Sequence, residues 1–238
     1  MGQTQYVYAG SSWAMTSFPM NNHATNLAKQ WAVPCIDATR GATSVLDSVA
    51  LVKKFKQSKP IVWVYNDPLY DLQAVTGIDH TEFLTRSDWQ DIWHECNQHC
   101  LNAISGLGVP VLLIGGTSDI VNCNYTNITV GHSSWQKYLA SQAGMPVNDG
   151  TVTVSLLDGT VFSVDLCWGA ENLHKCMYDN PNIDPDPNLV SSIWDIFYFW
   201  QQLQAMNLFH DVHPNFQANQ LFADFLLPTV EKFLKENK

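Results

Sequence analysis

Apolar residues fall into short unbroken runs in the first half of the chain, and these runs predict buried β-strands. Each run is bounded by glycine, proline or polar residues, which is the pattern of strands that are covered on both faces. Alternation of apolar and polar residues, which would indicate a strand with one wet face, is absent from them. The predicted strands cover residues 6–9, 33–37, 60–65 and 109–114.

Between and after these runs, apolar positions recur at the spacing of an α-helix. Ser44 and Ser87 are placed to cap two of the helices. Alternating strands and helices predict an α/β protein with a parallel central sheet, because the helices supply the right-handed crossovers. The predicted helices cover residues 22–31, 44–56, 88–105, 191–206 and 215–236.

The middle of the chain has a different pattern. Asp158-Gly159 separates two apolar runs, at 152–157 and 160–164, and predicts a hairpin with a type I′ turn. Three prolines between residues 179 and 187 predict a loop. We therefore expect one domain over residues 1–238, in which residues 117–190 form an insertion or cap.

Charge narrows the possible partners. The 238 residues include 12 Lys+Arg and 22 Asp+Glu, which gives a formal net charge of −10. Only Arg40 and Arg86 are arginines, so a nucleic-acid partner is not expected, since phosphate binding needs a basic surface. No apolar stretch is long enough to span a membrane, and the N-terminus does not resemble a signal peptide. We expect a soluble, cytoplasmic protein, and the sequence does not indicate its oligomeric state.

The six cysteines show no zinc-ribbon spacing, which favours reduced thiols. Cys96 and Cys100 lie one helical turn apart beside His94 and His99. Two half-buried thiols on an amphipathic helix are the simpler interpretation, and a metal site is the alternative.

Two further groups of residues have alternative interpretations. Asp184 and Asp186 suggest a solvated loop, with calcium binding as the alternative. The tryptophans fall into two groups: some are candidates for the buried face of a helix, and others are candidates for lining a pocket. Helix spacing predicts burial of Trp89, Trp93, Trp194 and Trp200, while Trp13 and Trp168 are candidates for lining a pocket.

Polar segments follow the predicted strands at positions suited to chemistry. In a parallel sheet, ligands bind at the carboxyl ends of the strands, and a serine in a strand-to-helix turn is well placed as a nucleophile. A histidine that enters from a late loop can act as its base. These segments are Gly10-Ser11-Ser12-Trp13, Arg40-Gly41-Ala42, Asn66-Asp67-Pro68 and 210–215.

In order and spacing, these segments resemble the four sequence blocks of the SGNH (GDSL-type) hydrolase family. Gly10-Ser11-Ser12 is similar to its Gly-Asp-Ser block, and Val64-Tyr65-Asn66-Asp67 is similar to its Gly-x-Asn-Asp block. The segment 210–214 is similar to its Asp-x-x-His-Pro block. The resemblance extends over most of the chain and implies a flavodoxin-like three-layer fold. Asn66-Asp67-Pro68-Leu69, Ile114-Gly115-Gly116 and His213-Pro214-Asn215 also resemble compact SGNH-like proteins of bacteriophages.

The resemblance implies a role for individual residues. Ser12 is then the nucleophile and His213 its base. The backbone N–H groups of Ser12 and Gly41 and the side-chain amide of Asn66 form the oxyanion hole, and Asp211 is the candidate acid that orients His213. No metal and no organic cofactor are implied.

The chain departs from the family pattern in three places. Ser11 stands where the family has Asp, and Val64 stands where it has Gly. The residue three before His213 is His210, whereas Asp211 lies two before it. In an extended chain this shift of one residue turns a side chain to the opposite face. Asp211 can orient His213 only if the loop bends; otherwise a backbone carbonyl, His210 or Asp119 supports the base.

These observations predict a serine esterase that cleaves a short-chain acyl or acetyl ester, on a small molecule or linked to a carbohydrate. A carbohydrate O-deacetylase is one alternative. A catalytically weak or inactive binding or virion-associated module on the same scaffold is another, because fold alone does not fix function. A flavodoxin-like nucleotide binder is not expected, since the chain has neither a GxGxxG motif nor a P-loop.

Overall fold

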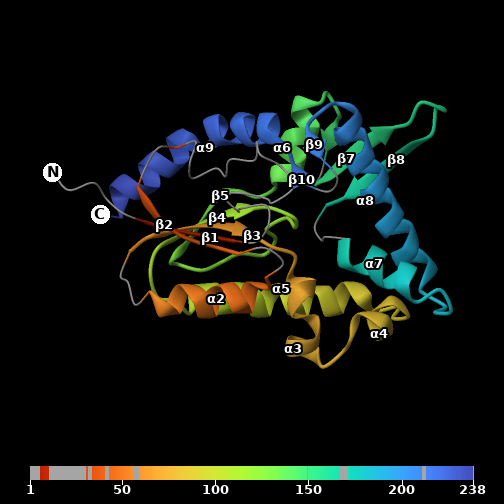
Figure 1. Ribbon diagram of the computed structural model, residues 1–238, viewed down its shortest axis with the longest axis horizontal. Helices are drawn as coiled ribbons and strands as arrows, with labels where there is room; N and C mark the ends of the chain where they lie inside the picture. The colour runs from red at the N-terminus through yellow and green to blue at the C-terminus, as the bar shows by residue number, and fades with distance from the viewer. Residues whose placement is uncertain are drawn as a thin grey trace.

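A five-stranded parallel sheet forms the centre of the computed structural model (Figure 1). The structure describes residues 6–10, 31, 34–40, 43–55, 59–148, 150–166, 171–210 and 213–237. The strand order is β2-β1-β3-β4-β5, and each neighbouring pair is parallel. The predicted α/β, flavodoxin-like fold class is therefore confirmed, because this is the flavodoxin strand order. The strands are β1 (Tyr6–Gly10), β2 (Cys35–Thr39), β3 (Ile61–Tyr65), β4 (Val111–Gly115) and β5 (Ile128–His132).

Four of these strands agree with the predicted ones, but three begin one or two residues later than expected. Every residue of β1, β3 and β4 is buried, as unbroken apolar runs require. Pro34, Pro60 and Pro110 each stand immediately before a strand. Proline has no N–H to give to a ladder, so it marks the first possible start of β2, β3 and β4.

Helices cover both faces of the sheet, which gives three layers (Figure 1). Side chains of β3 alternate between the layers: Val62 and Val64 pack on one side, Trp63 and Tyr65 on the other. The second side faces α2 (Val45–Lys54) and the C-terminal half of α5 (Trp89–Ser105). The first side faces α6 (Trp135–Gln142) and α9 (Phe216–Glu236).

The long C-terminal helix α9 is fixed by aromatic packing and a cap. Phe222 stacks on Trp135 of α6, with ring centroids 4.6 Å apart. Asn215 caps the helix by accepting a hydrogen bond from the N–H of Ala218, as the predicted start at residue 215 requires. Phe225 lies on the predicted apolar side yet is 46% exposed.

Short elements connect these layers and extend the carboxyl end of the sheet. After β3 come η1 (Pro68–Asp71), α3 (Leu72–Thr76) and α4 (His80–Leu84). A second, antiparallel sheet contains β6 (Val147–Asn148), β7 (Thr151–Ser155) and β8 (Val161–Asp165). The remaining elements are α7 (Glu171–Asp179), α8 (Pro187–Ala205), β9 (Phe209–His210) and β10 (His213–Pro214). Of the helices in the described ranges, none combines the length and apolar character that a membrane crossing requires.

The structure changes several details of the middle segment. Residues 128–132 form β5, so the central sheet continues into the segment 117–190. One domain with a cap over the remaining residues stays a prediction. The hairpin β7–β8 is confirmed, but its turn is not type I′, because only Gly159 of Asp158-Gly159 has a positive φ. Bonds from Gly159 N to Leu156 O and from Leu156 N to Thr160 O instead make a three-residue loop with glycine in its bulge position.

Two helix starts and one tryptophan also differ from expectation. Asp88 rather than Ser87 is the N-cap of α5. Pro187 opens α8 instead of belonging to the loop, because proline suits the first helical position. Trp194 is 41% exposed, in contrast to the predicted burial. Trp89, Trp93 and Trp200 are buried as expected. Trp13, Trp168 and residues 22–30 of the predicted helix 22–31 lie outside the described residues.

Candidate functional site

Hydrogen bonds join the end of β1 to the segments that follow β2 and β3. Arg40 N donates to Gly10 O at 3.2 Å, and Thr43 Oγ1 donates to Arg40 O at 2.7 Å. Asn66 Nδ2 in turn donates to Thr43 O at 2.9 Å. The end of β1 and the described residues after β2 and β3 therefore meet at one edge of the sheet. That edge includes the carboxyl ends of β1 and β3, the switch point at which folds of this strand order bind ligands.

Asn66 is held rigidly at this edge. Its side chain is 1% exposed and comes directly after β3, whose residues are all buried. Asp67 continues the anchoring, since its carboxylate accepts a hydrogen bond from Leu69 N at 3.0 Å and caps η1. Local capping thus fixes the chain on the C-terminal side of Asn66, and β3 fixes it on the other side.

Three of the residues that sequence resemblance assigns to the site lie outside the described residues. They are Ser12, Gly41 and Asp211. The structure describes Gly10, two residues before Ser12, and it describes Arg40 and His210, which directly precede Gly41 and Asp211. Their roles stay predictions.

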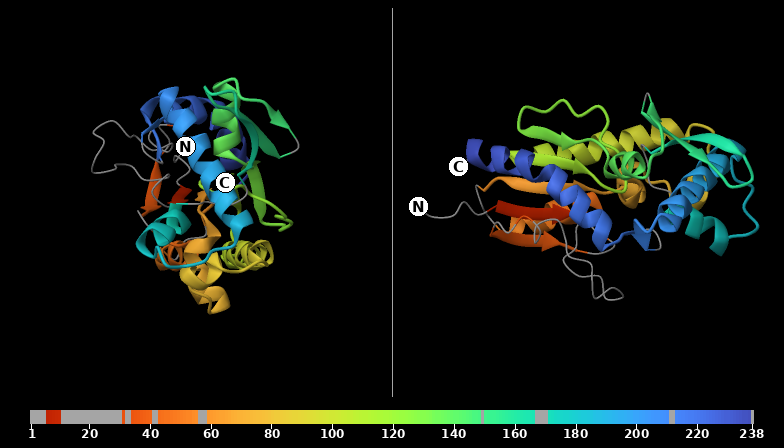
Figure 2. Two further views of the ribbon diagram at one scale, coloured as in Figure 1. Left: turned by 90° about the vertical axis from the view of Figure 1, so that its right-hand side faces the viewer. Right: turned by 90° about the horizontal axis from the view of Figure 1, so that it is seen from above.

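His213 lies in a two-stranded ribbon at the carboxyl end of the central sheet (Figures 1 and 2). It pairs with His210 across the antiparallel β9–β10 ladder. Side chains of such a pair lie on the same face of a ribbon. His210, one of the residues that sequence analysis considered as a support for His213, is therefore its cross-strand neighbour.

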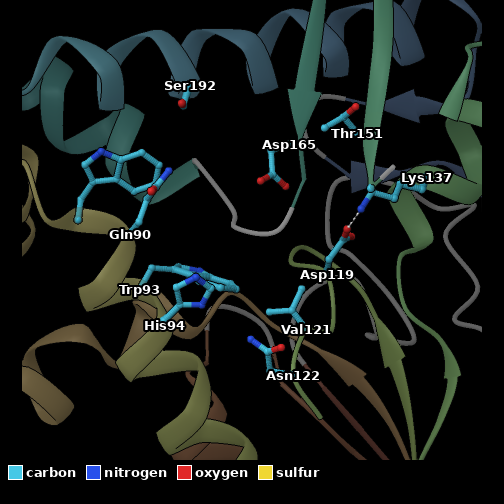
Figure 3. A pocket seen from close by; sticks show the side chains of 12 residues that line it. Gln90, Trp93, His94, Asp119, Val121, Asn122, Lys137, Thr151, Asp165 and Ser192 are labelled. Carbon is cyan, nitrogen blue, oxygen red and sulfur yellow. Dashed lines mark ion pairs between the residues drawn. The ribbon is translucent and has the colours of Figure 1, made fainter. Parts of the chain in front are cut away.

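A pocket of about 460 Å³ opens beside these strand ends (Figure 3). Residues from the loop after β4, from α5, α6 and α8, and from the β7–β8 hairpin form its walls. Side chains on all of these elements face the space between them in Figure 3. The lining residues are Trp89, Gln90, Trp93, His94, Asp119, Val121, Asn122, Lys137, Gly150, Thr151, Asp165 and Ser192.

An ion pair between Asp119 and Lys137 closes one side of this pocket. Asp119 is only 2% exposed. Burial raises the pKa of its carboxyl to about 6, and Asp165 adds to the rise, while Lys137 and Ser134 oppose it. The structure thus gives Asp119 the partner Lys137. Support of His213 by Asp119 stays a prediction.

Sequence reasoning missed Lys137 and the pocket. Lys137 and Asp119 are 18 positions apart and belong to different elements, so no local spacing links them. The doublet Gly115-Gly116 was the available signal for close packing here. A Cβ on Gly116 would lie 2.5 Å from the Tyr65 carbonyl oxygen, so only glycine allows the chain after β4 to approach the end of β3 this closely.

The pocket adjoins the segment that contains Asn66. Ser118 Oγ donates to Asp67 Oδ1 at 3.5 Å, and both residues are buried. Asp67 follows Asn66, and Ser118 precedes Asp119. The end of β3 and the pocket floor are therefore neighbours.

Cys96 and Cys100 are fully buried, so the prediction of half-buried thiols was wrong. Burial raises the pKa of the Cys96 thiol to about 12 and that of Cys100 well above its ordinary value. Cys100 Sγ donates to Asp71 Oδ2 at 3.5 Å. In the part of the chain that the structure describes, no three His, Cys, Asp or Glu side chains gather as a metal site requires.

Asp186 caps a helix, and this role competes with the alternative of a calcium site at Asp184 and Asp186. Asp186 Oδ1 accepts hydrogen bonds from the N–H groups of Asn188 and Leu189, each at 3.0 Å. This carboxylate is the N-cap of α8. Helix capping is therefore the role that its contacts support.

No family model and no curated protein match the sequence. Among solved structures, the chain is similar to protein YxiM from Bacillus subtilis, with a TM-score of 0.41 and 11% sequence identity. The alignment covers 98% of this chain and 57% of that one, so the chain spans little more than half the length of YxiM. A likeness at this level carries no argument about activity.

Proposed function

We propose that this protein is a serine hydrolase that cleaves a short-chain acyl or acetyl ester through an acyl-enzyme on Ser12. The observation that carries the proposal is the hydrogen-bonded connection Gly10–Arg40–Thr43–Asn66. It joins the flanks of three segments that resemble SGNH blocks at the switch point of the sheet. His213, from the fourth such segment, lies in the ribbon at the same end of the sheet.

In the proposed reaction, Ser12 Oγ attacks the ester carbonyl carbon while His213 accepts its proton. The carbonyl oxygen becomes an oxyanion, which the N–H groups of Ser12 and Gly41 and the Asn66 amide stabilise. Each such donor is typically worth about 3 kcal/mol in the transition state. The C–O bond then breaks, and His213 gives its proton to the leaving alcohol.

The second half of the reaction restores the enzyme. Water attacks the acyl-enzyme carbonyl, and His213 takes one of its protons. The acid is released as Ser12 recovers its proton from His213. In this proposal Asp211 orients His213, and His210 is the alternative residue for that role because it pairs with His213 across the ribbon.

A fluorescent fluorophosphonate tests the proposal, because it forms a covalent bond with activated serines only. We expect wild-type protein to be labelled and to hydrolyse p-nitrophenyl acetate. Ser12→Ala should lose both, with turnover falling by several orders of magnitude, as in other enzymes that lose the nucleophile. Ser11→Ala is the matched control and should keep both.

Labelling that survives in Ser12→Ala would overturn the assignment of the nucleophile. A folded wild-type protein that is neither labelled nor active would overturn the hydrolase proposal. That second result would favour a binding module on the same scaffold, for which the departures at Ser11 and His210 are the sequence argument.

A further inference from the structure

The pocket beside the end of β3 is lined mainly by polar residues, which do not suit the acyl chain of an ester. Val121 is the one aliphatic side chain among its described lining residues. A site for an acyl chain would instead be lined mainly by aliphatic and aromatic groups. The pocket therefore suits a polar part of a ligand.

Hydrogen-bonding groups face this space from opposite walls (Figure 3). Gln90 lies on α5, Asn122 on the loop after β4, Asp165 on β8 and Ser192 on α8. The two amides and the hydroxyl can each donate and accept hydrogen bonds, while the carboxylate accepts them. This mixture matches the hydroxyl groups of a ligand, which are donors and acceptors at once.

The charges in the pocket do not favour an anionic ligand. The only lysine of the lining, Lys137, is already paired with Asp119, and Asp165 adds a second carboxylate. The whole chain carries a formal charge of −10, which repels anions further. Asp165 is exposed to solvent, where a single carboxylate holds a cation only weakly. A neutral ligand meets none of these penalties.

Two indoles complete the lining. Trp89 and Trp93 lie on the α5 wall and are 8% and 2% exposed, so they add a small, rigid apolar area to it. A sugar ring presents C–H groups on its faces and hydroxyls at its rim, so it can contact this small apolar area and the polar groups together. The cavity of about 460 Å³ lies within the range of small-molecule sites, roughly 300–1,000 Å³.

We infer that this pocket binds a neutral sugar unit of a saccharide. If the proposed function holds, this unit is the alcohol part of the ester, and the bond to be cleaved lies at the neighbouring end of β3. The hydrogen bond between Ser118 and Asp67 connects the two places. The claim that a saccharide binds does not depend on Ser12, whereas the claim that it is the substrate's alcohol rests on the proposed function.

The test measures saccharide binding directly, on the full-length Ser12→Ala protein, so that turnover does not interfere. Saturation-transfer NMR and titration calorimetry would use xylotriose, cellotriose and N-acetylated chitotriose as probes, with butyrate as the acyl probe. We expect at least one trisaccharide to bind and butyrate not to bind. The double variant Gln90→Leu/Ser192→Ala should weaken binding about tenfold or more, because it removes partners from two walls.

Gln201→Leu/Ser191→Ala is the matched control, since both residues are exposed on α8 and lie outside the described pocket lining. It should leave binding unchanged. Failure of all three trisaccharides to bind the folded protein would overturn the inference. So would binding that the pocket variant does not alter.

The two proposals can fail separately. Ester hydrolysis that depends on Ser12, without any saccharide binding, would keep the hydrolase and remove the sugar site. Saccharide binding at the pocket without ester hydrolysis would keep the sugar site and remove the hydrolase.

Discussion

Asn66 donates its side-chain amide N–H to the Thr43 carbonyl oxygen, 2.9 Å away, from a position that is 1% exposed. The bond joins the end of β3 to the residue that precedes the N-cap of α2. It fixes the rotation of the amide and the position of the Thr43 carbonyl. One interaction therefore serves the fold and, in the proposed function, the oxyanion hole.

Replacement of Asn66 by alanine should reveal both roles. We expect the free energy of unfolding to fall by about 1–3 kcal/mol, since the Thr43 carbonyl loses its buried donor. Turnover of p-nitrophenyl acetate should fall by about 10²–10³, the usual effect of removing an oxyanion donor. Urea unfolding and steady-state kinetics on the same preparations measure the two quantities.

Asn97→Ala is the matched control, because Asn97 is also 1% exposed and its amide donates to Val121 O at 3.3 Å. It should lose stability with much less effect on turnover. An Asn66→Ala variant that loses no more turnover than Asn97→Ala would restrict Asn66 to a structural role.

The buried carboxyl of Asp119 should make stability depend on pH. Its pKa is raised from 3.8 to about 6, chiefly by burial, so the native state holds this proton more tightly than the unfolded chain does. The resulting stabilisation is full below about pH 4 and is lost as pH rises through about 6. The difference in unfolding free energy between wild type and Asp119→Asn should therefore fall between about pH 4 and about pH 7. A difference that stays constant or rises over this range would contradict the expectation.

Removal of the lysine alone should be more harmful than removal of both charges. At about pH 8, Lys137→Met leaves the Asp119 carboxylate nearly buried without its cation, which typically costs about 3–5 kcal/mol. Near pH 5 the cost should be smaller, because the carboxyl can take up a proton. The double variant Asp119→Asn/Lys137→Met should recover much of the loss at about pH 8. Chemical denaturation of the three variants at both pH values checks this, and equal losses in the single and double variants would contradict it.

The thiols of Cys96 and Cys100 should be inert in the native protein. Both are fully buried, and burial raises the pKa of each, so little thiolate forms. We expect iodoacetamide at about pH 8 to modify them only after unfolding. The partly exposed Cys176 on α7 should react earlier and serves as an internal control. Peptide mass spectrometry after a time course identifies each site, and early modification of Cys100 would show that its surroundings open readily.

Three of the four strands that the sequence predicted, β1, β3 and β4, are buried along their whole length. The fourth, β2, is an edge strand and is only partly buried. Trp63 and its neighbours in β3 are all fully or almost fully buried, so their pattern needs no tertiary information. β5, the other edge strand, was missed because Thr129 and Val130 in its middle are exposed. β5 therefore lacks the unbroken buried run by which β3 was predicted.

The candidate site also has parts that the sequence could predict and parts that it could not. Asn66 follows a strand that the sequence marks clearly, so its place at the carboxyl edge was predictable. The partner of Asp119 was not, because Lys137 reaches it only after α6 has packed beside the end of β4. Partners that are brought together by packing alone leave no spacing in the sequence. The pocket walls come from five separate parts of the chain and share that property.

The position of α9 as the last element has a consequence for biosynthesis. The strands of the central sheet are all complete once residue 132 has been made, yet α9, which packs on β5 and α6, begins only at Phe216. At about 5–20 residues per second, the ribosome needs roughly 5–20 seconds to reach the end of α9. During that interval the apolar side chains under Phe222 and Leu226 have no final cover. Until α9 has been synthesised, a nascent chain of this protein therefore exposes apolar surface that the folded protein covers.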